Sequence, residues 1–496
     1  MKIHKLIPLL CLAFAFTACH DDDAETVLEV NGNVSDITAE YGLNFDKYGA
    51  PVPNDPEYSD EFLIFTVKSN VSPTVKVDDN WVHVEYAKTE KQVHTYNVTV
   101  EPNKSNDSRT TKIRVFAGDQ QNSIIVSQAR GRFSESNGMT ALDIAKEMKA
   151  GINIGNTLEA PDGETSWGQP LVNEYYIQGL KDAGFNAVRI PVAWNSHAKD
   201  GVIKEEWLNR VDSVVGYVID AGMYAIVNCH WDGGWLEENI TWAAQQGVND
   251  LQKKYWTQIA NKLADYDEHL LFAATNEPNA IKDGDNEWDR KDKIDILVDY
   301  QKTMIDAVRA TGGINAVRTI IVQGPNTNID QTLQYYYLPE DSANDRLMVE
   351  VHYYDPYQFC LMEEDQSWGK VQWFWGTGNL VSGSDRNAKS GEADMQAQFA
   401  KMKERYVDNG IPVILGEYGA YPNEHYTSLQ TLEDQNAILK SRVAYYNCVN
   451  KYGLSAGIIP YAWDTGELVS RYGGSVLVPE IVNAIISGAA SATSPY

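Results

Sequence analysis

Cysteine is scarce in this chain, which has five cysteines among 496 residues. Two of them, Cys11 and Cys19, fall in the N-terminal segment, and the other three are far apart at Cys229, Cys360 and Cys448. Three thiols with that spacing form neither a disulfide framework nor a metal-binding pattern. We therefore expect these three to be small buried side chains.

Positive charge is also in short supply. The chain carries 41 Lys and Arg against 69 Asp and Glu, a formal net charge of −28. Without a basic stripe to displace counterions, nucleic acid and anionic membrane surfaces are poor partners. A neutral polymer is compatible with this charge, although an acidic, soluble surface explains it equally well. Aromatic residues reach 11%, with 13 Trp and 28 Tyr. Sugar-binding sites use such flat rings, but protein cores use them too.

The N-terminal apolar run, Leu6–Ala18, is too short to cross a bilayer as a helix and follows two lysines, as in a secretory signal. It ends in Phe16-Thr17-Ala18-Cys19, which resembles a bacterial lipobox. The next residues, His20-Asp21-Asp22-Asp23, are similar to the acidic export tag of Bacteroidetes surface lipoproteins. The alternative is a chance cysteine in an ordinary signal peptide. We expect a signal peptide over residues 1–18, a lipid on Cys19 as the only membrane contact, a tether over 19–29, and a location on the outer face of the outer membrane.

Residues 30–131 alternate short apolar runs with polar turn clusters. The runs are Phe62–Val67, Trp81–Val84, Tyr96–Val100, Lys112–Val115 and Ser123–Val126. This alternation without a helical period predicts a small all-β, immunoglobulin-like sandwich. The text of Ser108–Val115 and Ile124–Ala129 resembles the BACON module of Bacteroidetes glycan-degrading proteins. That name implies sugar binding, but we favour a rigid spacer. A polar linker follows over residues 132–139.

Residues 140–496 alternate strand-length apolar runs with amphipathic helices. One helix, expected over Glu205–Ala221, places its apolar side chains on one face and stops at Gly222. The eight strand-like runs are Ile152–Ile154, Ala187–Ile190, Tyr224–Val227, Leu271–Ala274, Thr319–Val322, Met348–Val351, Val413–Leu415 and Gly457–Pro460. This rhythm predicts an α/β fold, a (β/α)₈ TIM barrel. A doubly wound sheet is the alternative, but the first run lacks the spacing of a Gly-rich phosphate turn.

In such barrels the active site lies at the carboxyl ends of the strands. Each predicted strand delivers a polar or aromatic residue there, in order Asn156, Arg189, Asn228 with His230, Asn276 with Glu277, Gln323, His352 with Tyr354, Glu417, and Trp463 with Asp464. Each of these has an ordinary structural explanation when it is taken alone. Eight together indicate a site.

Glu277 and Glu417 follow predicted strands 4 and 7, which face each other across the barrel mouth. Cleavage of a glycosidic bond needs two carboxyl groups, one for the leaving oxygen and one for the oxocarbenium-like carbon. Asn276 is placed to bind the sugar 2-hydroxyl. We expect Arg189 to keep Glu417 ionised by lowering its pKa, while Glu277 stays protonated. Tyr354 can orient Glu417, and Trp463 can form a flat floor.

The same segments resemble glycoside hydrolase family 5, and its subfamily 4 in particular. The matching text is Asn153–Leu158, Val188–Val192, Asn228–His230, Thr275–Pro278, His352–Pro356 and Leu415–Gly419, within residues 140–490. The resemblance implies a retaining mechanism with Glu277 as acid/base, Glu417 as nucleophile, no metal and no cofactor. It implies that the family's other active-site positions are Arg189, His230, Asn276, His352, Tyr354 and Trp463. The chain departs from many relatives at Trp231, where they carry a second histidine.

Further substrate contacts are expected from Asn156, His197 and loop tryptophans. Trp235, Trp242, Trp368, Trp373 and Trp375 follow predicted strands 3 and 6, on the catalytic face, although tryptophans also anchor loops. The leading function is an endo-β-1,4-glucanase on a plant polysaccharide, with xyloglucan as the expected substrate. A mixed-linkage β-glucanase or cellulase, a β-mannanase or a xylanase are alternatives. A non-catalytic glycan-binding lipoprotein is disfavoured because both glutamates are present. We expect a monomer that works beside surface glycan-binding and import proteins.

Overall fold

The computed structural model describes residues 26–33, 35–37, 42–47, 49, 51–52, 64–103, 105, 107–130, 136–421 and 431–496. The chain divides into two compact units, one of Met1–Asn103 with Asp107–Arg130 and one of Lys104–Asn106 with Gly131–Tyr496. The expected signal peptide and the expected lipidation residue Cys19 lie outside the described residues. Each unit is described by itself.

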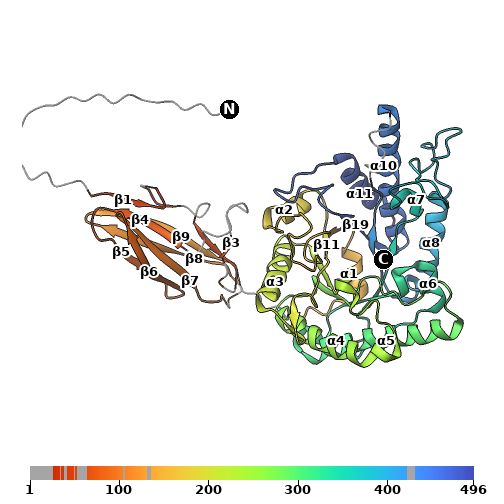
Figure 1. The fold of residues 1–496 in the computed structure, drawn as a ribbon, viewed down its shortest axis with the longest axis horizontal. Coiled ribbons are helices and arrows are strands. Elements are labelled where there is room, and N and C mark those ends of the chain that lie inside the picture. The colour runs from red at the N-terminus through yellow and green to blue at the C-terminus, as the bar shows by residue number, and fades with distance from the viewer. Residues whose placement is uncertain are drawn as a thin grey trace, which may run out of the picture. The chain divides into compact units, whose positions relative to one another are not determined.

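The N-terminal unit contains two β-sheets with one core between them (Figure 1). One sheet has the order β1-β4-β7-β6 and the other β3-β2-β9-β8-β5. The strands are β1 (Leu28–Val30), β2 (Leu43–Phe45), β3 (Pro51–Val52), β4 (Ile64–Ser69), β5 (Thr74–Val77), β6 (Val82–Glu90), β7 (Val93–Val100), β8 (Arg109–Ala117) and β9 (Gln120–Gln128). Every second residue of β4, β7 and β8 points into the core, and Phe65 of β4, Val98 of β7 and Ile113 of β8 are fully buried. The expected β-sandwich is confirmed, and β1, β2, β3 and β5 are strands that the sequence analysis did not identify.

The larger unit is a closed barrel of eight parallel strands in chain order (Figure 1). Its strands are β10 (Gly151–Ile154), β11 (Ala187–Ile190), β14 (Tyr224–Asn228), β15 (Leu270–Ala273), β16 (Ile320–Gln323), β17 (Leu347–Tyr353), β18 (Val413–Tyr418) and β19 (Ile458–Asp464). Strand β19 pairs with β10 and closes the ring. The predicted (β/α)₈ barrel is confirmed, and every predicted strand overlaps an observed one.

The α-helices in the described part of the larger unit are α1 (Ala141–Glu147), α2 (Glu174–Asp182), α3 (Glu205–Asp220), α4 (Trp242–Lys262), α5 (Glu287–Ala310), α6 (Ile329–Tyr335), α7 (Tyr357–Cys360), α8 (Glu392–Arg405), α10 (Leu432–Ser455) and α11 (Pro479–Ser491), with a small hairpin of β12 (Ala198–Lys199) and β13 (Val202–Ile203). Most of the helices lie between successive strands on the outside of the barrel, whereas α1 precedes β10 and packs against the amino-terminal end, and α11 follows β19. Helix α3 confirms its prediction: Val211, Val214 and Val218 are fully buried. Gly222 follows at φ +70, a left-handed conformation that ends helices. No helix among the described residues is long and apolar enough to cross a membrane.

The barrel interior changes from apolar to polar along the strands. Its amino-terminal end packs Ile226, Leu271, Met348 and Ile414 together with Ile144 of α1. Side chains alternate between the two faces of a strand, so the residues two positions later along each strand also point inward. On β11, β14, β16 and β17 this position is polar, at Arg189, Asn228, Gln323 and Glu350, and His352 lies two residues further along β17. The apolar part of the barrel interior therefore lies at the amino-terminal end, and polar groups fill the carboxyl end.

The cysteines of the larger unit are free thiols. Cys229 and Cys360 are buried, and Cys448 is partly buried. The expectation of small, packed side chains is confirmed for the first two and partly for the third.

Candidate active site

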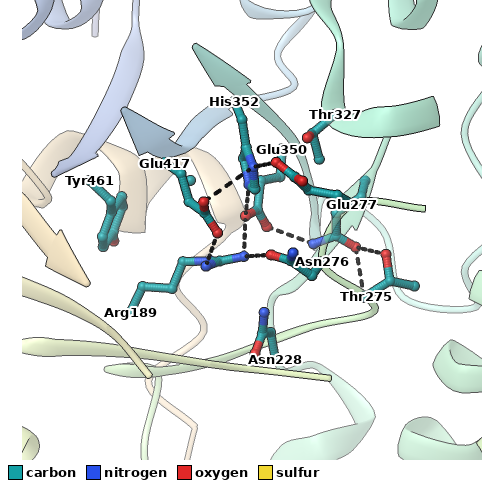
Figure 2. Close-up of polar contacts among 12 residues, drawn as sticks. Arg189, Asn228, Thr275, Asn276, Glu277, Thr327, Glu350, His352, Glu417 and Tyr461 are labelled. Carbon is teal, nitrogen blue, oxygen red and sulfur yellow. Dashed lines mark hydrogen bonds and ion pairs between the residues drawn. The ribbon is translucent and has the colours of Figure 1, made fainter. Parts of the chain in front are cut away.

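Arg189 of β11 is the centre of the polar end of the barrel. It is fully buried, and its guanidinium lies 3.0 Å from Glu417 Oε1 and 3.0 Å from Glu350 Oε1 (Figure 2). It also donates to Asn276 Oδ1 at 2.9 Å and to Asn153 Oδ1 at 3.0 Å. One planar cation thus fixes side chains from β10, β17, β18 and the turn after β15, because its rigid fork donates in several directions at once.

His352 of β17 connects the two predicted catalytic glutamates. Its Nδ1 lies 2.7 Å from Glu277 Oε1 and 3.7 Å from Glu417 Oε2, and its Nε2 lies 3.2 Å from Glu350 Oε1 (Figure 2). The ring is buried, with 4% of its side chain exposed. Glu417 also accepts a hydrogen bond from Tyr354 Oη at 3.1 Å. The structure therefore brings together six residues, which we call the polar cluster: Arg189, Asn276, Glu277, His352, Tyr354 and Glu417.

The two carboxyl groups are close together. One oxygen of Glu277, one of Glu417 and a ring nitrogen of His352 all lie within 4.8 Å of one another. Among the residues that the structure describes, no other group of His, Cys and acidic side chains is near enough to share an ion. We assign these three to acid–base chemistry because each ring nitrogen of His352 already faces a carboxylate. This separation matches that of two carboxyl groups acting as nucleophile and acid, which lie about 5 Å apart. Two carboxyl groups that hold a water molecule between them lie farther apart.

The protonation of the two glutamates depends on burial and on His352. Burial raises the pKa of Glu417, and the charges of His352 and Arg189 only oppose this rise. Arg189 therefore acts on the pKa of Glu417 in the expected direction, but burial outweighs it and the pKa is raised. Burial also acts upward on Glu277, but the hydrogen bond and the charge of His352 lower its pKa. The expectation that Glu277 stays protonated is wrong for the free protein, since its pKa is lowered.

Exposure separates the two glutamates. The side chain of Glu277 is 47% exposed, whereas that of Glu417 is 9% exposed. Glu277 is therefore open to solvent, whereas Glu417 is largely out of water and keeps its donors from Arg189 and Tyr354.

Glu350 is a site residue that the sequence analysis missed. It is fully buried in β17, binds Arg189 and His352, and accepts from Gln323 Nε2 at 2.6 Å. Its pKa is lowered: burial acts upward, but the charge of Arg189 and the hydrogen bond from His352 outweigh it. The signal was present, since Glu350 lies two residues before His352 and so on the same face of an otherwise apolar strand.

Gly416 of β18 makes room for Glu350. A Cβ atom on Gly416 would lie 1.9 Å from Glu350 Oε1, well inside van der Waals contact. The glycine next to the predicted nucleophile is therefore required by its neighbour on β17.

Glu237 is the second residue that was missed. It is buried, with 3% exposed, and its Oε1 accepts the backbone amides of Asn276 at 2.8 Å and of Glu277 at 2.9 Å. Burial, aided by the charge of Glu277, raises the pKa of Glu237 to about 8 against the effect of its amide donors. Glu237 thus holds the backbone that carries the predicted acid.

His230 and Trp463 lie together at the barrel mouth. Their rings are nearly parallel with centroids 5.9 Å apart, and His230 Nδ1 lies 3.2 Å from Asn228 Nδ2. Burial and the charge of Arg189 hold the pKa of His230 well below its usual value, so the ring is neutral. Asn156 stands just after β10 at φ +61, and its backbone amide donates to Glu159.

Three expected substrate contacts have structural partners instead. Trp375 is 1% exposed and packs edge-on against Tyr445 at 5.2 Å, so the prediction that it lines a subsite is wrong. His197 stacks on Trp207 of α3 at 3.6 Å and is partly buried. Trp235 is also partly buried and lies edge-on to Tyr255 at 5.4 Å.

Other loop tryptophans remain open to solvent. Trp242 is 54% exposed, Trp368 is 63% exposed and Trp231 is 47% exposed. Trp373 is partly buried, with the Arg386 guanidinium 4.9 Å from its ring centre. All four belong to segments that follow β14 or β17, so they lie on the side of the barrel that carries the polar cluster.

Two family models match the chain. Residues 150–465 match cellulase (glycosyl hydrolase family 5), and residues 66–129 match BACON, a putative N-terminal binding domain. The first match covers well over half of the chain and contains every residue of the polar cluster.

Known proteins similar to the chain include one that matches both units. It is a xyloglucan-specific endo-β-1,4-glucanase of Bacteroides ovatus, 32% identical over 97% of this chain and 95% of its own length. A solved xyloglucan-specific β-1,4-glucanase from a ruminal metagenomic library is 39% identical over 72% of this chain and 98% of its own, with a TM-score of 0.66. A broad-specificity endoglucanase of subfamily 4 from Bacteroides salanitronis is 35% identical over 72% and 97%, with a TM-score of 0.62.

Proposed function

The chain belongs to glycosyl hydrolase family 5, and from that premise we propose that it cleaves xyloglucan, with Glu277 as acid/base and Glu417 as nucleophile. It is a retaining endo-β-1,4-glucanase that acts on a polysaccharide, as its relatives do. One observation carries the assignment of the two glutamates. Their carboxyl oxygens lie within 4.8 Å of each other in the ring of polar groups around Arg189 and His352, the spacing of a retaining pair.

The first chemical step forms a covalent bond to Glu417. Its carboxylate attacks the anomeric carbon, while Glu277 gives a proton to the departing glycosidic oxygen. Arg189 and Tyr354 hold the attacking group in place through contacts of 3.0 and 3.1 Å. Asn276 accepts from Arg189 through Oδ1, which leaves its amide NH₂ as the donor for the sugar 2-hydroxyl. The ring of Trp463, parallel to His230, supports the reacting sugar as a floor.

The second step releases the product. Glu277, now ionised, takes a proton from water, and the oxygen of that water attacks the anomeric carbon and frees Glu417. Two inversions at the same carbon return the β configuration. Glu237 keeps the backbone of Glu277 fixed through both steps by its two amide hydrogen bonds.

The substrate proposal is supported by likeness and by the loops. The similar Bacteroides ovatus protein, which matches both units, is xyloglucan-specific. The exposed rings of Trp231, Trp242 and Trp368 lie on the catalytic side of the barrel and can stack on sugars. A branched, soluble glucan offers side-chain sugars to such rings, which undecorated cellulose lacks.

A substrate panel tests this proposal. We expect kcat/KM on xyloglucan to exceed that on carboxymethyl cellulose by at least about 10-fold, roughly 1.4 kcal/mol of transition-state binding. Mixed-linkage glucan should fall between them. The similar Bacteroides salanitronis protein is of broad specificity, and comparable values on all three glucans would support that alternative. A higher value on mannan or xylan would contradict a glucan backbone.

We also propose that the protein is a surface lipoprotein that works as a monomer beside glycan-binding and import proteins. The lipobox-like Phe16-Thr17-Ala18-Cys19 and the aspartates after it support this location. Cys19→Ala should move the protein from the membrane fraction to the soluble fraction without changing its turnover on soluble substrate. Resistance of the native protein to protease added to whole cells would contradict surface exposure.

A further inference from the structure

Glu350, His352 and Glu277 form an unbroken chain from the buried barrel core to the exposed acid. Glu350 Oε1 lies 3.2 Å from His352 Nε2, and His352 Nδ1 lies 2.7 Å from Glu277 Oε1. Glu350 is fully buried, whereas the side chain of Glu277 is 47% exposed. A carboxylate, an imidazole and a second carboxyl group in this order can pass a proton along the chain (Figure 2).

The geometry restricts the protonation of His352. Both ring nitrogens face carboxylate oxygens, so a neutral ring places one lone pair against an oxygen unless that carboxyl group is protonated. Three states keep both contacts hydrogen bonds. The state with the Nε2 proton moved to Glu350 is disfavoured because the charge of Arg189 stabilises the ionised carboxylate, so two states remain. In one, the imidazolium donates to both carboxylates. In the other, the proton of Nδ1 has moved to Glu277, while Glu350 still accepts from Nε2–H.

We propose that His352 stores the proton that Glu277 gives to the leaving oxygen, and that Glu350 is the positioning residue that makes this possible. The proposal rests on the proposed glycosidase function. In the first step Nδ1–H moves to Glu277 Oε1, Glu277 protonates the glycosidic oxygen, and the bond from that oxygen to the anomeric carbon breaks as Glu417 bonds to the carbon. His352 is left neutral with Nε2–H held by Glu350.

The second step restores the proton. After the first step, ionised Glu277 lies beside the lone pair of Nδ1, and these two groups together attract a proton. Glu277 removes one from the attacking water and passes it to Nδ1 as the bond from Glu417 to the sugar breaks. Each proton given to the leaving group is thus replaced by one from water, and the charge of the cluster is the same at the start and the end.

The charges around His352 favour storage there. The ring faces Glu277, Glu417 and, from its own strand, Glu350. Arg189 of β11 binds the same oxygen of Glu350. The charge of Glu237 also interacts with that of His352, whereas neutral His230 adds no charge. Although burial opposes protonation, the charge of Glu417 and the hydrogen bonds to Glu277 and Glu350 raise the pKa of His352 to about 10.

Glu350→Gln tests the relay by its dependence on the leaving group. Departure of 2,4-dinitrophenolate from its β-cellobioside needs no proton, whereas departure of a sugar alcohol does. We expect kcat/KM on polysaccharide to fall by about 100-fold, the scale of lost acid catalysis, and that on the dinitrophenyl glycoside to fall far less. The alkaline limb of the polysaccharide pH profile should move to lower pH, because removal of the carboxylate lowers the pKa of His352. Azide should speed turnover of the dinitrophenyl glycoside and give the β-glycosyl azide.

Glu164→Gln is the matched control, since Glu164 is also a buried carboxylate paired with an arginine, Arg210, at 2.6 Å. It should change neither the ratio of the two activities nor the pH profile. Equal losses of Glu350→Gln on both substrates would overturn the relay and leave Glu350 as a support for Arg189. If Glu350→Gln does not fold, ¹⁵N NMR of native His352 decides, because a neutral ring at pH 7 overturns the proposal. Absence of hydrolysis of every glycoside by the native protein would instead contradict the proposed function.

Discussion

Glu417 is tightly constrained at the residue scale. Arg189 and Tyr354 contact its two oxygens at 3.0 and 3.1 Å, and only 9% of its side chain is exposed. Such contacts fix the direction of attack before the sugar arrives, which is how positioning lowers a barrier. They also explain why burial of this group is tolerated, since a buried charge needs donors.

Glu417→Ala should lower kcat by several orders of magnitude without unfolding the protein, because it removes the covalent route. Added azide should restore part of the rate and give an α-glycosyl azide, and the native product should first appear as the β-anomer by NMR. Glu205→Ala, which removes an exposed carboxylate paired with Lys262 at the surface, is the control. Initial release of the α-anomer would show that the pair does not retain configuration.

Glu237 gives a stability prediction that depends on pH. Its pKa is raised to about 8 in the folded protein, so the folded state holds a proton that the unfolded state releases near pH 4.5. The stability from this group is fully present below about pH 4.5 and is lost as pH rises toward 8. Glu237→Gln keeps the oxygen that accepts both amides but cannot ionise. Its Tm relative to the native protein should therefore increase steadily from pH 5 to pH 8.

Glu238→Gln is the control for that measurement. Glu238 is exposed, and its pKa is lowered, mainly by a hydrogen bond from the Asn279 side chain. Its Tm difference should not rise with pH over the same range. A constant Tm difference for Glu237→Gln from pH 5 to pH 8 would show that Glu237 does not carry the raised pKa.

The sequence analysis predicted roles for Glu277 and Glu417 but did not point to Glu350 and Glu237. Glu277 and Glu417 follow predicted strands within ordered motifs, and their chemistry is that of the expected reaction. Glu350 and Glu237 act through other residues, so the chemistry of the expected reaction gave no reason to look for them. Glu350 could have been found from its inward position in β17. Glu237 could not, because its partners are backbone amides that only the folded loops bring near it.

At the scale of elements, the barrel strands were predictable and the sandwich strands less so. Parallel strands that are buried on both faces appear in a sequence as short apolar runs. Each of the eight predicted runs overlaps an observed strand. Boundaries moved by up to four residues, with no change at β11 (Ala187–Ile190) and the largest at the end of β19 (Ile458–Asp464). In the sandwich, β5 (Thr74–Val77) has only exposed and half-buried residues, and β3 is two residues long. Such strands form because neighbours pair with them, which local pattern does not show.

The pairing of β17 with β18 gives a prediction about Gly416. Its missing Cβ leaves the space that Glu350 Oε1 occupies, 1.9 Å from the ideal Cβ position. Gly416→Ala should displace Glu350 and with it Arg189, at a cost of about 1–3 kcal/mol from overpacking. We expect a lower Tm and a lower kcat. Gly247→Ala, in α4 with nothing within 4 Å, is the control, and it should leave kcat unchanged and should not lower Tm. A Gly416→Ala protein with native Tm and kcat would show that the strands adjust freely.

Loop tryptophans were the least predictable elements of the site. Trp368 and Trp375 lie seven residues apart in the segment after β17, yet the first is 63% exposed and the second 1%. Both are tryptophans in the same segment, so the sequence offers no basis for telling them apart. What separates them is packing: Trp375 lies against Tyr445 of the distant helix α10. Only tertiary structure decides whether such a ring supports the loop or faces the sugar.

At the scale of the whole molecule, the two units have separate cores. The sandwich core contains only residues between Leu28 and Val126, and the two barrel cores only residues from Met139 onward. Tyr86 is the one aromatic side chain exposed by more than a third in the described part of the sandwich. Trp81 is 7% exposed, with the Arg109 guanidinium 4.3 Å from its ring centre. A surface with so few open rings favours a spacer over a sugar-binding role.

Removal of residues 1–130 tests that spacer role. The remaining chain keeps every residue of the barrel cores and of the polar cluster, so it should fold alone. We expect its kcat/KM on soluble xyloglucan to stay within about 2-fold of the native value, because a unit with its own core and site works independently. The isolated sandwich should not be retarded in gels that contain xyloglucan. A loss of activity in the barrel alone, or retardation of the sandwich, would instead assign substrate binding to the N-terminal unit, and a Tyr86→Ala variant would then show whether the exposed ring of Tyr86 carries it.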